Sequence, residues 1–362
     1  MSARTRISAV VLLALAALSG LSSGHAASST YTVVDLGSFA ATGDATSACA
    51  DVYDGGVQAI NAEGMVTGQT GWGDKPYAAF RATNGTVKRL KGGKGGGIGQ
   101  DINSSGQVAG SVTDKQAADL CDFSGSRPAT HAATWVGGTL TLLPVDDAEQ
   151  SSQAVALNDD GIIVGWATIS ENLQPLVWRD GVVSELPLPE GVDGVIGAVP
   201  VDINADGQII GFLKFSDFSI VRGVLWDGDE ATMLPEGFQV NAINDEGTII
   251  GSTNEGTRAA WIVKGKLKKL PGSPDDAARV RVVAINADQD VVGYTQATEG
   301  IGNGTPVLWR DGEAIDAQTL LPDGADLSIR YLADINDTGM IAAGAVDGNG
   351  EEHGIVLVPA ES

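Results

Sequence analysis

One short phrase recurs seven times in this chain and constrains its fold more than any other feature. It reads Ile or Leu, Asn, two further residues, and then Gly (Gln in the sixth copy). Consecutive asparagines are 42, 55, 46, 40, 42 and 50 residues apart. Repeats of this length are single supersecondary units that bury their apolar faces against their neighbours. The seven asparagines are Asn61, Asn103, Asn158, Asn204, Asn244, Asn286 and Asn336.

Each repeat is predicted to hold four short antiparallel strands, which we call a, b, c and d in chain order. Runs rich in β-branched residues favour strands, whereas Asn, Asp and Gly between them favour tight turns. No segment beyond the N-terminal leader has sustained helical periodicity. In the third repeat the predicted strands are 153–157, 162–166, 176–178 and 182–186, with turns at 158–161 and 179–181.

A large aromatic residue recurs at one position of strand c. Five of the seven tryptophans occupy this position, so repeat packing explains them better than a ligand-stacking role does. We therefore expect these rings to be wedged between neighbouring units. The residues are Phe80, Trp135, Trp178, Trp226, Trp261 and Trp309, and Leu357 takes the place in the last repeat.

The two ends of the repeat region complement each other. The last repeat has strands at 331–336, 340–344 and 354–358 but no strand d, while the isolated segment 31–37 has the pattern of a strand d. Pairing the two closes a ring and leaves no long unpaired edge between units. The sequence thus predicts an all-β, seven-bladed β-propeller in a single domain over residues 27–362.

Residues 1–26 have the organisation of a secretory signal peptide. Arg4 and Arg6 precede an apolar run over residues 9–18, and Gly24-His25-Ala26 supplies small residues for cleavage after Ala26. An apolar run of about ten residues is shorter than the roughly 20 needed to span a bilayer. We expect an exported protein, secreted or periplasmic, without a membrane span.

The chain is strongly acidic, with a formal net charge of −24. Cleavage of the leader would leave 20 basic and 46 acidic side chains, a charge of −26. Such a surface repels nucleic acid, so we expect no nucleic-acid partner. Much of the acidity lies in turns and also serves solubility. The oligomeric state is left open.

The connections between strands predict one uniform face and one variable face. Turns a–b and c–d are short in every repeat, whereas connections b–c and d–a vary and share the opposite face of a four-stranded meander. The two longest connections, 38–56 and 111–130, carry Cys49 and Cys121. An even cysteine count in an exported chain and loops on adjacent blades both predict a Cys49–Cys121 disulfide.

The repeat also resembles a known family. Residues 101–110, Asp-Ile-Asn-Ser-Ser-Gly-Gln-Val-Ala-Gly, followed by His131-Ala-Ala-Thr-Trp135, are similar to the unit of the HAF-repeat proteins. The resemblance extends over residues 31–358 and implies an exported bacterial protein with a propeller-like fold. It implies no particular activity.

Candidate ligand-binding residues cluster near the two long loops. Trp72 lies outside the repeat position for tryptophan, so repeat packing does not account for it. Aromatic rings beside polar groups suit sugars or peptides, although loops merely held together by a disulfide are an alternative. The candidates are Tyr53, Asp54, Trp72, Lys75, Tyr77, Asp122, Phe123 and Arg127.

Recognisable catalytic, cofactor and metal motifs are missing from the sequence. Beyond the N-terminal leader there is no Gly-x-Ser-x-Gly or His-Glu-x-x-His, and His131 and His353 occupy the same point of two repeats. Glycine-rich 92–97 lacks the ending of a phosphate loop and is expected to be a flexible d–a connection. Residues 347–351 resemble a calcium loop only weakly, so we predict no metal site and no cofactor.

Two functions are compatible with these features. The first is an exported binding or scaffold propeller that engages a glycan, peptide or surface partner through the variable face. The second is an extracellular carbohydrate-active hydrolase or lyase with its site in the propeller funnel. A glycosidase needs two opposed carboxylates, and the long loops offer Asp51, Asp54, Asp114 and Asp122.

Overall fold

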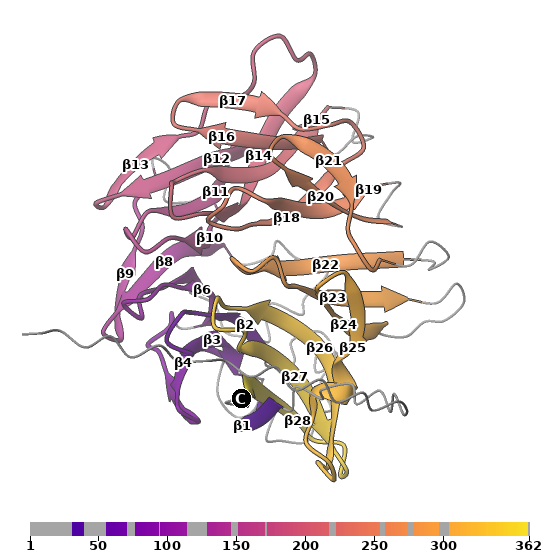
Figure 1. Cartoon of the computed structure of the whole chain (residues 1–362). Helices are drawn as coiled ribbons and strands as arrows, with labels where there is room; N and C mark the ends of the chain where they lie inside the picture. Colours follow the sequence, from indigo (N-terminus) through magenta and orange to yellow (C-terminus); the bar gives the residue numbers. More distant parts are fainter. Residues whose placement is uncertain are drawn as a thin grey trace, which may run out of the picture.

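Seven four-stranded antiparallel sheets form the blades of a ring (Figure 1). The structure is a computed structural model that describes residues 31–39, 56–70, 77–93, 95–113, 129–145, 151–170, 172–216, 222–253, 258–273, 279–296 and 304–360. The sequence prediction of a seven-bladed, all-β propeller is confirmed. The described residues contain a single short helical turn, η3 (Ala317–Leu320), between blades 6 and 7.

Each blade runs from the innermost strand a to the outermost strand d. Blade 1 consists of β2 (Gly56–Ile60), β3 (Val66–Thr70), β4 (Ala78–Thr83) and β5 (Thr86–Arg89). Blade 2 consists of β6 (Gly96–Ile102), β7 (Val108–Thr113), β8 (Thr130–Val136) and β9 (Thr139–Leu142). Blade 3 consists of β10 (Ser152–Leu157), β11 (Ile163–Ile169), β12 (Asn172–Arg179) and β13 (Val182–Glu185). Blade 4 consists of β14 (Val195–Ile203), β15 (Ile209–Phe215), β16 (Arg222–Asp227) and β17 (Glu230–Met233). Blade 5 consists of β18 (Gln239–Ile243), β19 (Ile249–Thr253), β20 (Arg258–Val263) and β21 (Lys266–Lys269). Blade 6 consists of β22 (Arg279–Ile285), β23 (Val291–Gln296), β24 (Thr305–Arg310) and β25 (Glu313–Asp316).

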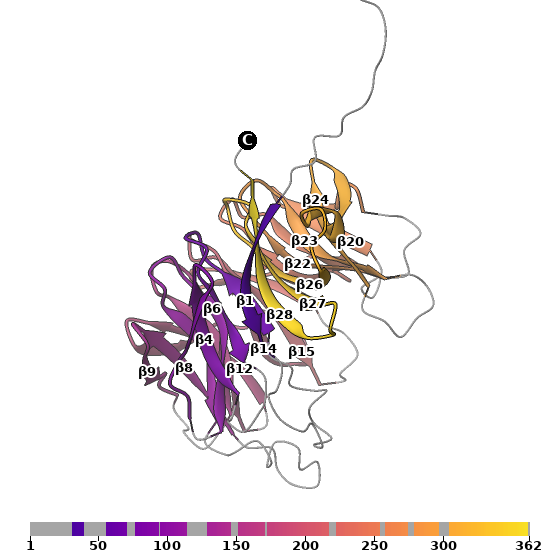
Figure 2. The ribbon, with the colours of Figure 1, turned by 90° about the horizontal axis from the view of Figure 1, so that it is seen from below.

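Blade 7 is assembled from both ends of the chain. It contains β26 (Leu327–Ile335), β27 (Ile341–Asp347) and β28 (Glu352–Pro359), and β1 (Tyr31–Ser38) supplies its outer strand. The pairing runs from Tyr31 opposite Pro359 to Ser38 opposite His353. Figures 1 and 2 both show β1, in indigo, lying along the yellow β28. The predicted closure of the ring by the N-terminal strand agrees with this arrangement.

The recurring aromatic residues lie between the blades, as predicted. Trp135, Trp178, Trp226 and Phe80 are at most 1 % exposed, and Trp309 is 2 % exposed. Trp135 packs against apolar residues of blade 1 as well as its own blade. The indole N–H groups of Trp135, Trp178 and Trp226 also donate hydrogen bonds of 2.6–2.7 Å to backbone carbonyls that follow the preceding blade. Each indole therefore joins two blades through both apolar and polar contacts.

The recurring asparagine closes the a–b turn of its own blade. In blade 3, Asn158 Oδ1 accepts the backbone N–H of Ile162 at 3.0 Å, and the backbone N–H of Asn158 donates to the carbonyl of Ile162 at 3.1 Å. Gly161 takes a φ of +75°, which a Cβ would disfavour. In blade 6 Gln289 takes this place with φ +66°, so the departure from Gly leaves the turn geometry unchanged.

The same asparagines also join every blade to the next. Each side-chain Nδ2 donates to the backbone carbonyl of the asparagine in the following blade, at 2.8–3.2 Å. The last of these bonds runs from Asn336 back to Asn61, so seven amides form a closed ring of hydrogen bonds. All seven side chains are buried, so both polar ends of each amide are satisfied within the protein.

This ring marks the uniform face of the propeller. All seven a–b turns contain five residues and all six c–d turns contain two. The b–c connections range from 2 to 16 residues and the d–a connections from 5 to 17. One predicted loop is shorter than expected: Gly96 and Gly97 begin β6 instead of belonging to a flexible connection. A Cβ on Gly96 would collide with the carbonyl of Tyr77, which explains the glycine there.

Candidate functional site

Most of the residues predicted to bind a ligand lie outside the described residues. These are Tyr53, Asp54, Trp72, Lys75, Asp122, Phe123 and Arg127, together with both cysteines, Cys49 and Cys121, and the candidate acids Asp51 and Asp114. Tyr77 is described. It is 6 % exposed and lies against the start of β6, where its carbonyl accepts the N–H of Gly97 at 3.3 Å.

The centre of the ring contains three aspartates that precede the Ile-Asn phrase: Asp101, Asp202 and Asp334. Each follows a β-bulge in the innermost strand of blade 2, 4 or 7. Each carboxylate accepts two backbone N–H groups, one from the next residue and one from the blade that follows. For Asp101 these donors are Ile102 at 2.7 Å and Leu157 at 2.8 Å. These carboxylates therefore join blade 2 to 3, blade 4 to 5 and blade 7 to 1.

Burial near the axis dominates the ionisation of these three groups. It raises the pKa of Asp101 to about 6, that of Asp202 to about 7 and that of Asp334 to about 8. The negative charges of the other members raise the pKa of Asp202 and Asp334 further, whereas the backbone N–H donors oppose the shift. Strongly shifted pKa values often mark functional sites. Whether these three aspartates form such a site depends on what their carboxylate oxygens already bind.

A structural role accounts for all three carboxylates. Together they accept the backbone N–H of the residue before the recurring asparagine in six of the seven blades. These residues are Ile60, Ile102, Leu157, Ile203, Ile243 and Ile335. Blade 6 is the exception, because alanines occupy both positions from which an aspartate would reach Ile285: Ala242 and Ala284. Since each carboxylate spans two blades, an odd number of blades leaves one without a partner.

A second set of aspartates, from blades 3, 5 and 7, lies beside the asparagine ring at the end of the propeller axis. Asp159, Asp245 and Asp337 accept, each at 2.8 Å, the backbone N–H of Ser104, Ala205 and Ala287 in the preceding blade. The asparagine turns and these acids line a polar hollow of about 200 Å³. Because one oxygen of each of these carboxylates already accepts a backbone N–H group, we interpret this hollow as the end of the blade junction and not as a ligand site.

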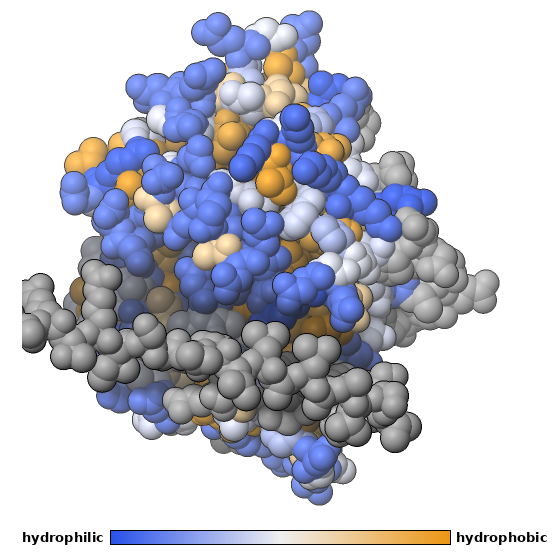
Figure 3. Space-filling model, in the orientation of Figure 1, coloured by the Kyte–Doolittle hydropathy of each residue, from blue (hydrophilic) through white to orange (hydrophobic). Residues whose placement is uncertain are grey.

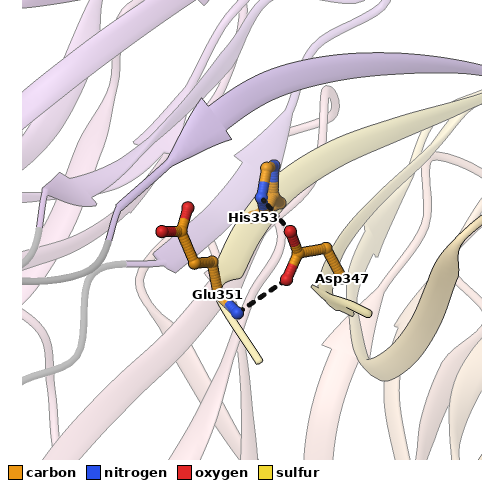
Figure 4. A group of neighbouring side chains, drawn as sticks. All are labelled: Asp347, Glu351 and His353. Carbon is orange, nitrogen blue, oxygen red and sulfur yellow. Dashed lines mark hydrogen bonds and ion pairs between the residues drawn. The ribbon is translucent and has the colours of Figure 1, made fainter. Parts of the chain in front are cut away.

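A different group of titratable side chains lies on the variable face, at the b–c turn of blade 7. Asp347, Glu351 and His353 converge there from the end of β27 and the start of β28 (Figure 4). One possible ligand atom from each lies within 4.8 Å of the other two. Among the residues that the structure describes, this is one group of three His, Cys, Asp or Glu side chains, and their spacing could hold a metal ion.

The backbone of this turn repeats the design of the asparagine turns. Asp347 Oδ1 accepts the N–H groups of Asn349 and Glu351 at 2.9 and 2.8 Å, and Gly350 has a φ of +85°. The N–H of Glu351 and the side-chain amide of Asn349 are the main causes that lower the pKa of Asp347. The turn therefore holds an ionised carboxylate in a fixed orientation next to His353.

Sequence reasoning reached only part of this site. It noted that residues 347–351 weakly resemble a calcium loop and that His353 occupies the same point of its repeat as His131. The structure places His353 in β28. Sequence reasoning did not connect the loop with His353, and it did not involve Asp35, because the pairing of β1 with β28 joins residues 318 positions apart. The Asp-Ile-Asn triplets were a visible signal for the axial carboxylates, but their direction depends on a bulge that the residue pattern does not reveal.

The face of the molecule seen in Figure 3 is mainly polar. Hydrophilic residues predominate on the face seen in Figure 3, with hydrophobic residues scattered among them. Across the described ranges there is no helix with the length and apolar character required to cross a membrane.

Comparison with known proteins identifies the fold and no family. No family profile matches the chain, and neither does any curated protein sequence. Among solved structures, acylaminoacyl peptidase from Pyrococcus horikoshii is similar with a TM-score of 0.52 at 12% identity, over 83% of this chain and 52% of that one. YCF48 from Cyanidioschyzon merolae has a TM-score of 0.48 at 10% identity, over 85% of this chain and 97% of that one. Virginiamycin B lyase from Staphylococcus aureus has a TM-score of 0.44 at 12% identity, over 85% and 97%. At such identities the likeness concerns the fold alone.

Proposed function

We propose that this protein is an exported binding or scaffold propeller that engages a glycan, peptide or surface partner through its b–c and d–a connections. The observation that carries this proposal is the contrast between its two faces. One face has turns of constant length tied by a closed ring of hydrogen bonds, whereas the connections on the other vary from 2 to 17 residues. Loops that vary on a rigid scaffold are where proteins usually place binding residues.

The axial chemistry supports binding rather than catalysis. Asp101, Asp202 and Asp334 are the most strongly perturbed carboxyls on the axis, yet each already accepts two backbone N–H groups. A carboxylate held in this way is poorly placed to act as an acid, base or nucleophile towards a substrate. The resemblance to the HAF-repeat proteins fits an exported protein of this kind, and we retain it as part of the proposal.

The binding proposal is tested with glycan and polysaccharide arrays, a peptide array and a product assay on the same samples. We expect binding without release of reducing ends or unsaturated sugars. Trp72→Ala should weaken that binding at least tenfold, because loss of one stacking ring costs about 1.4 kcal/mol or more. Val182→Ala is the control, since Val182 is 69 % exposed on β13, the outer strand of blade 3. Release of product would instead establish the carbohydrate-active enzyme.

Export and the disulfide are tested together by mass spectrometry of the unreduced protein from the extracellular or periplasmic fraction. We expect the chain to begin at Ala27 and a peptide containing Cys49 to be linked to one containing Cys121. Reduction should lower the midpoint of thermal unfolding, because a bond across 72 residues removes loop entropy worth roughly 4 kcal/mol. An uncleaved leader would contradict export, and two free thiols would contradict the disulfide.

A further inference from the structure

The b–c turn of blade 7 carries a histidine whose two ring nitrogens have different environments. The Nδ1 atom of His353 lies 3.0 and 3.1 Å from the two carboxylate oxygens of Asp35 on the neighbouring strand β1. The Nε2 atom is buried and has no hydrogen-bond partner. The Oδ2 atom of Asp347 lies 4.0 Å from it. In the neutral tautomer that donates Nδ1–H to Asp35, Nε2 carries the lone pair that can bind a metal ion.

We propose that His353 Nε2, Asp347 and Glu351 bind one divalent transition-metal ion of the zinc class, with Asp35 orienting the imidazole. A carboxylate that accepts the second ring N–H of a histidine ligand is the usual companion of such a ligand, because it fixes the tautomer and raises its basicity. Asp35 has this relation to His353. The proposal goes beyond the binding function proposed for the b–c and d–a connections, since it assigns a metal ion to one b–c turn together with strands β1, β27 and β28.

The spacing of the donors suits a shared ion. On a tetrahedral ion with metal–ligand bonds of about 2.0–2.2 Å, two donors lie about 3.3–3.6 Å apart. The 4.0 Å between Nε2 and Asp347 Oδ2 is too long for a hydrogen bond, and an approach of about half an ångström would bring both atoms to one ion. Figure 4 shows the carboxylate of Glu351 projecting from the same turn, and small side-chain rotations would bring it to the ion.

The charge of the site also favours a cation. Asp35, Asp347 and Glu351 place three carboxylates around one imidazole. The carboxylate of Asp326 also lies beside the turn, where a Cβ on Gly348 would come within 2.6–2.7 Å of its oxygens. Gathering like charges is unfavourable unless a counter-charge joins them. A protonated His353, ion-paired with Asp35 and Asp347, is the competing solution, and it binds no metal.

The identity of the ion follows from the donors. An imidazole nitrogen with carboxylate oxygens suits zinc and neighbouring first-row metals, whereas calcium and magnesium prefer oxygen donors alone. Three protein ligands also leave at least one coordination position free for water or for a donor from a bound molecule.

The test is calorimetric titration of the metal-free, untagged protein with ZnCl₂, and in parallel with CaCl₂ and MgCl₂. We expect one zinc ion per chain, a rise in the thermal midpoint on adding zinc, and no comparable response to calcium or magnesium. Cobalt(II) should give a visible absorption band of a low-symmetry site. His353→Gln should abolish the zinc response, and Glu351→Gln, at an exposed position, should weaken it at least tenfold.

Two variants separate the site from general effects. Asp347→Asn retains the oxygen that accepts the turn N–H groups but removes the charge, so we expect it to fold and to bind zinc at least tenfold more weakly. His131→Gln is the matched control, because His131 occupies the equivalent position of strand c in blade 2. Absence of a zinc response in the wild type would overturn the proposal. So would zinc binding that survives His353→Gln, or that His131→Gln weakens equally.

Discussion

Replacing Asn158 by alanine should lower the free energy of unfolding by about 3 kcal/mol, measured by urea denaturation at neutral pH. The change removes the acceptor of the Ile162 N–H, which is part-buried, and the donor to the Asn204 carbonyl, which is buried. A buried polar group left without its partner costs about 1–3 kcal/mol. The loss also opens the ring of seven amides at one junction, so unfolding should become less cooperative across blades 3 and 4.

Two further variants define this prediction. Asn172→Ala, at an exposed position at the start of β12, should change stability by less than about 0.5 kcal/mol. Asn158→Asp keeps an oxygen for the turn but places a carboxylate against the Asn204 carbonyl. Its stability should therefore recover partly below about pH 4, where the carboxyl is protonated and can donate. If Asn158→Ala is no more destabilising than Asn172→Ala, the amide ring does not hold the blades together.

The protein should be more stable near pH 5 than near pH 9. In the folded state burial raises the pKa of Asp101, Asp202 and Asp334 to about 6, 7 and 8, above the value near 3.9 of an unfolded aspartate. Between these values the native state binds more protons than the unfolded state. The free energy of unfolding therefore falls as pH rises from about 4 to about 8 and becomes level above that.

The triple variant Asp101→Asn, Asp202→Asn and Asp334→Asn isolates this effect. Its amides do not titrate, so its unfolding free energy should lack the part of the slope that the three carboxyls cause. The difference from wild type should change by on the order of 8 kcal/mol in total between pH 5 and pH 9, at about 1.4 kcal/mol for each pH unit between 5 and each pKa. Asp160→Asn, at an exposed turn position, should leave the slope unchanged. Equal slopes for the triple variant and the wild type would show that the axial carboxyls are already ionised at pH 5.

The junctions between blades are not equivalent, and this follows from the odd number of blades. The junctions of blade 2 with 3 and of blade 4 with 5 have an asparagine bond and carboxylates of both axial sets. Blades 6 with 7 and 7 with 1 have one carboxylate each. Of the axial bonds described here, the junctions of blades 1 with 2, 3 with 4 and 5 with 6 have only the asparagine amide. Trp135 and Trp226 add an indole hydrogen bond at the junctions of blades 1 with 2 and 3 with 4. Local opening should therefore begin at the junction of blades 5 and 6.

The repeat predicted much of this architecture because its information is local. Asn, Gly and β-branched residues at fixed spacing determine tight turns and strands within each unit, and seven units of similar length close a ring. The unpaired strand pattern over 31–37 predicted the closure, because an incomplete last blade needs an outer strand. The buried position of Trp135, Trp178, Trp226 and Trp309 followed from their recurrence at one strand position.

The second role of each asparagine depended on the tertiary structure. The side-chain oxygen acts within five residues, which a sequence pattern can show, whereas the nitrogen reaches a carbonyl 40–55 residues away or, at the closure, 275 residues away. The same distinction applies to Asp101, Asp202 and Asp334, whose bulges turn them towards a neighbouring blade. It applies most clearly to Asp35 and His353, at opposite ends of the chain. Local geometry repeats with the sequence, but contacts across the ring exist only once the ring has closed.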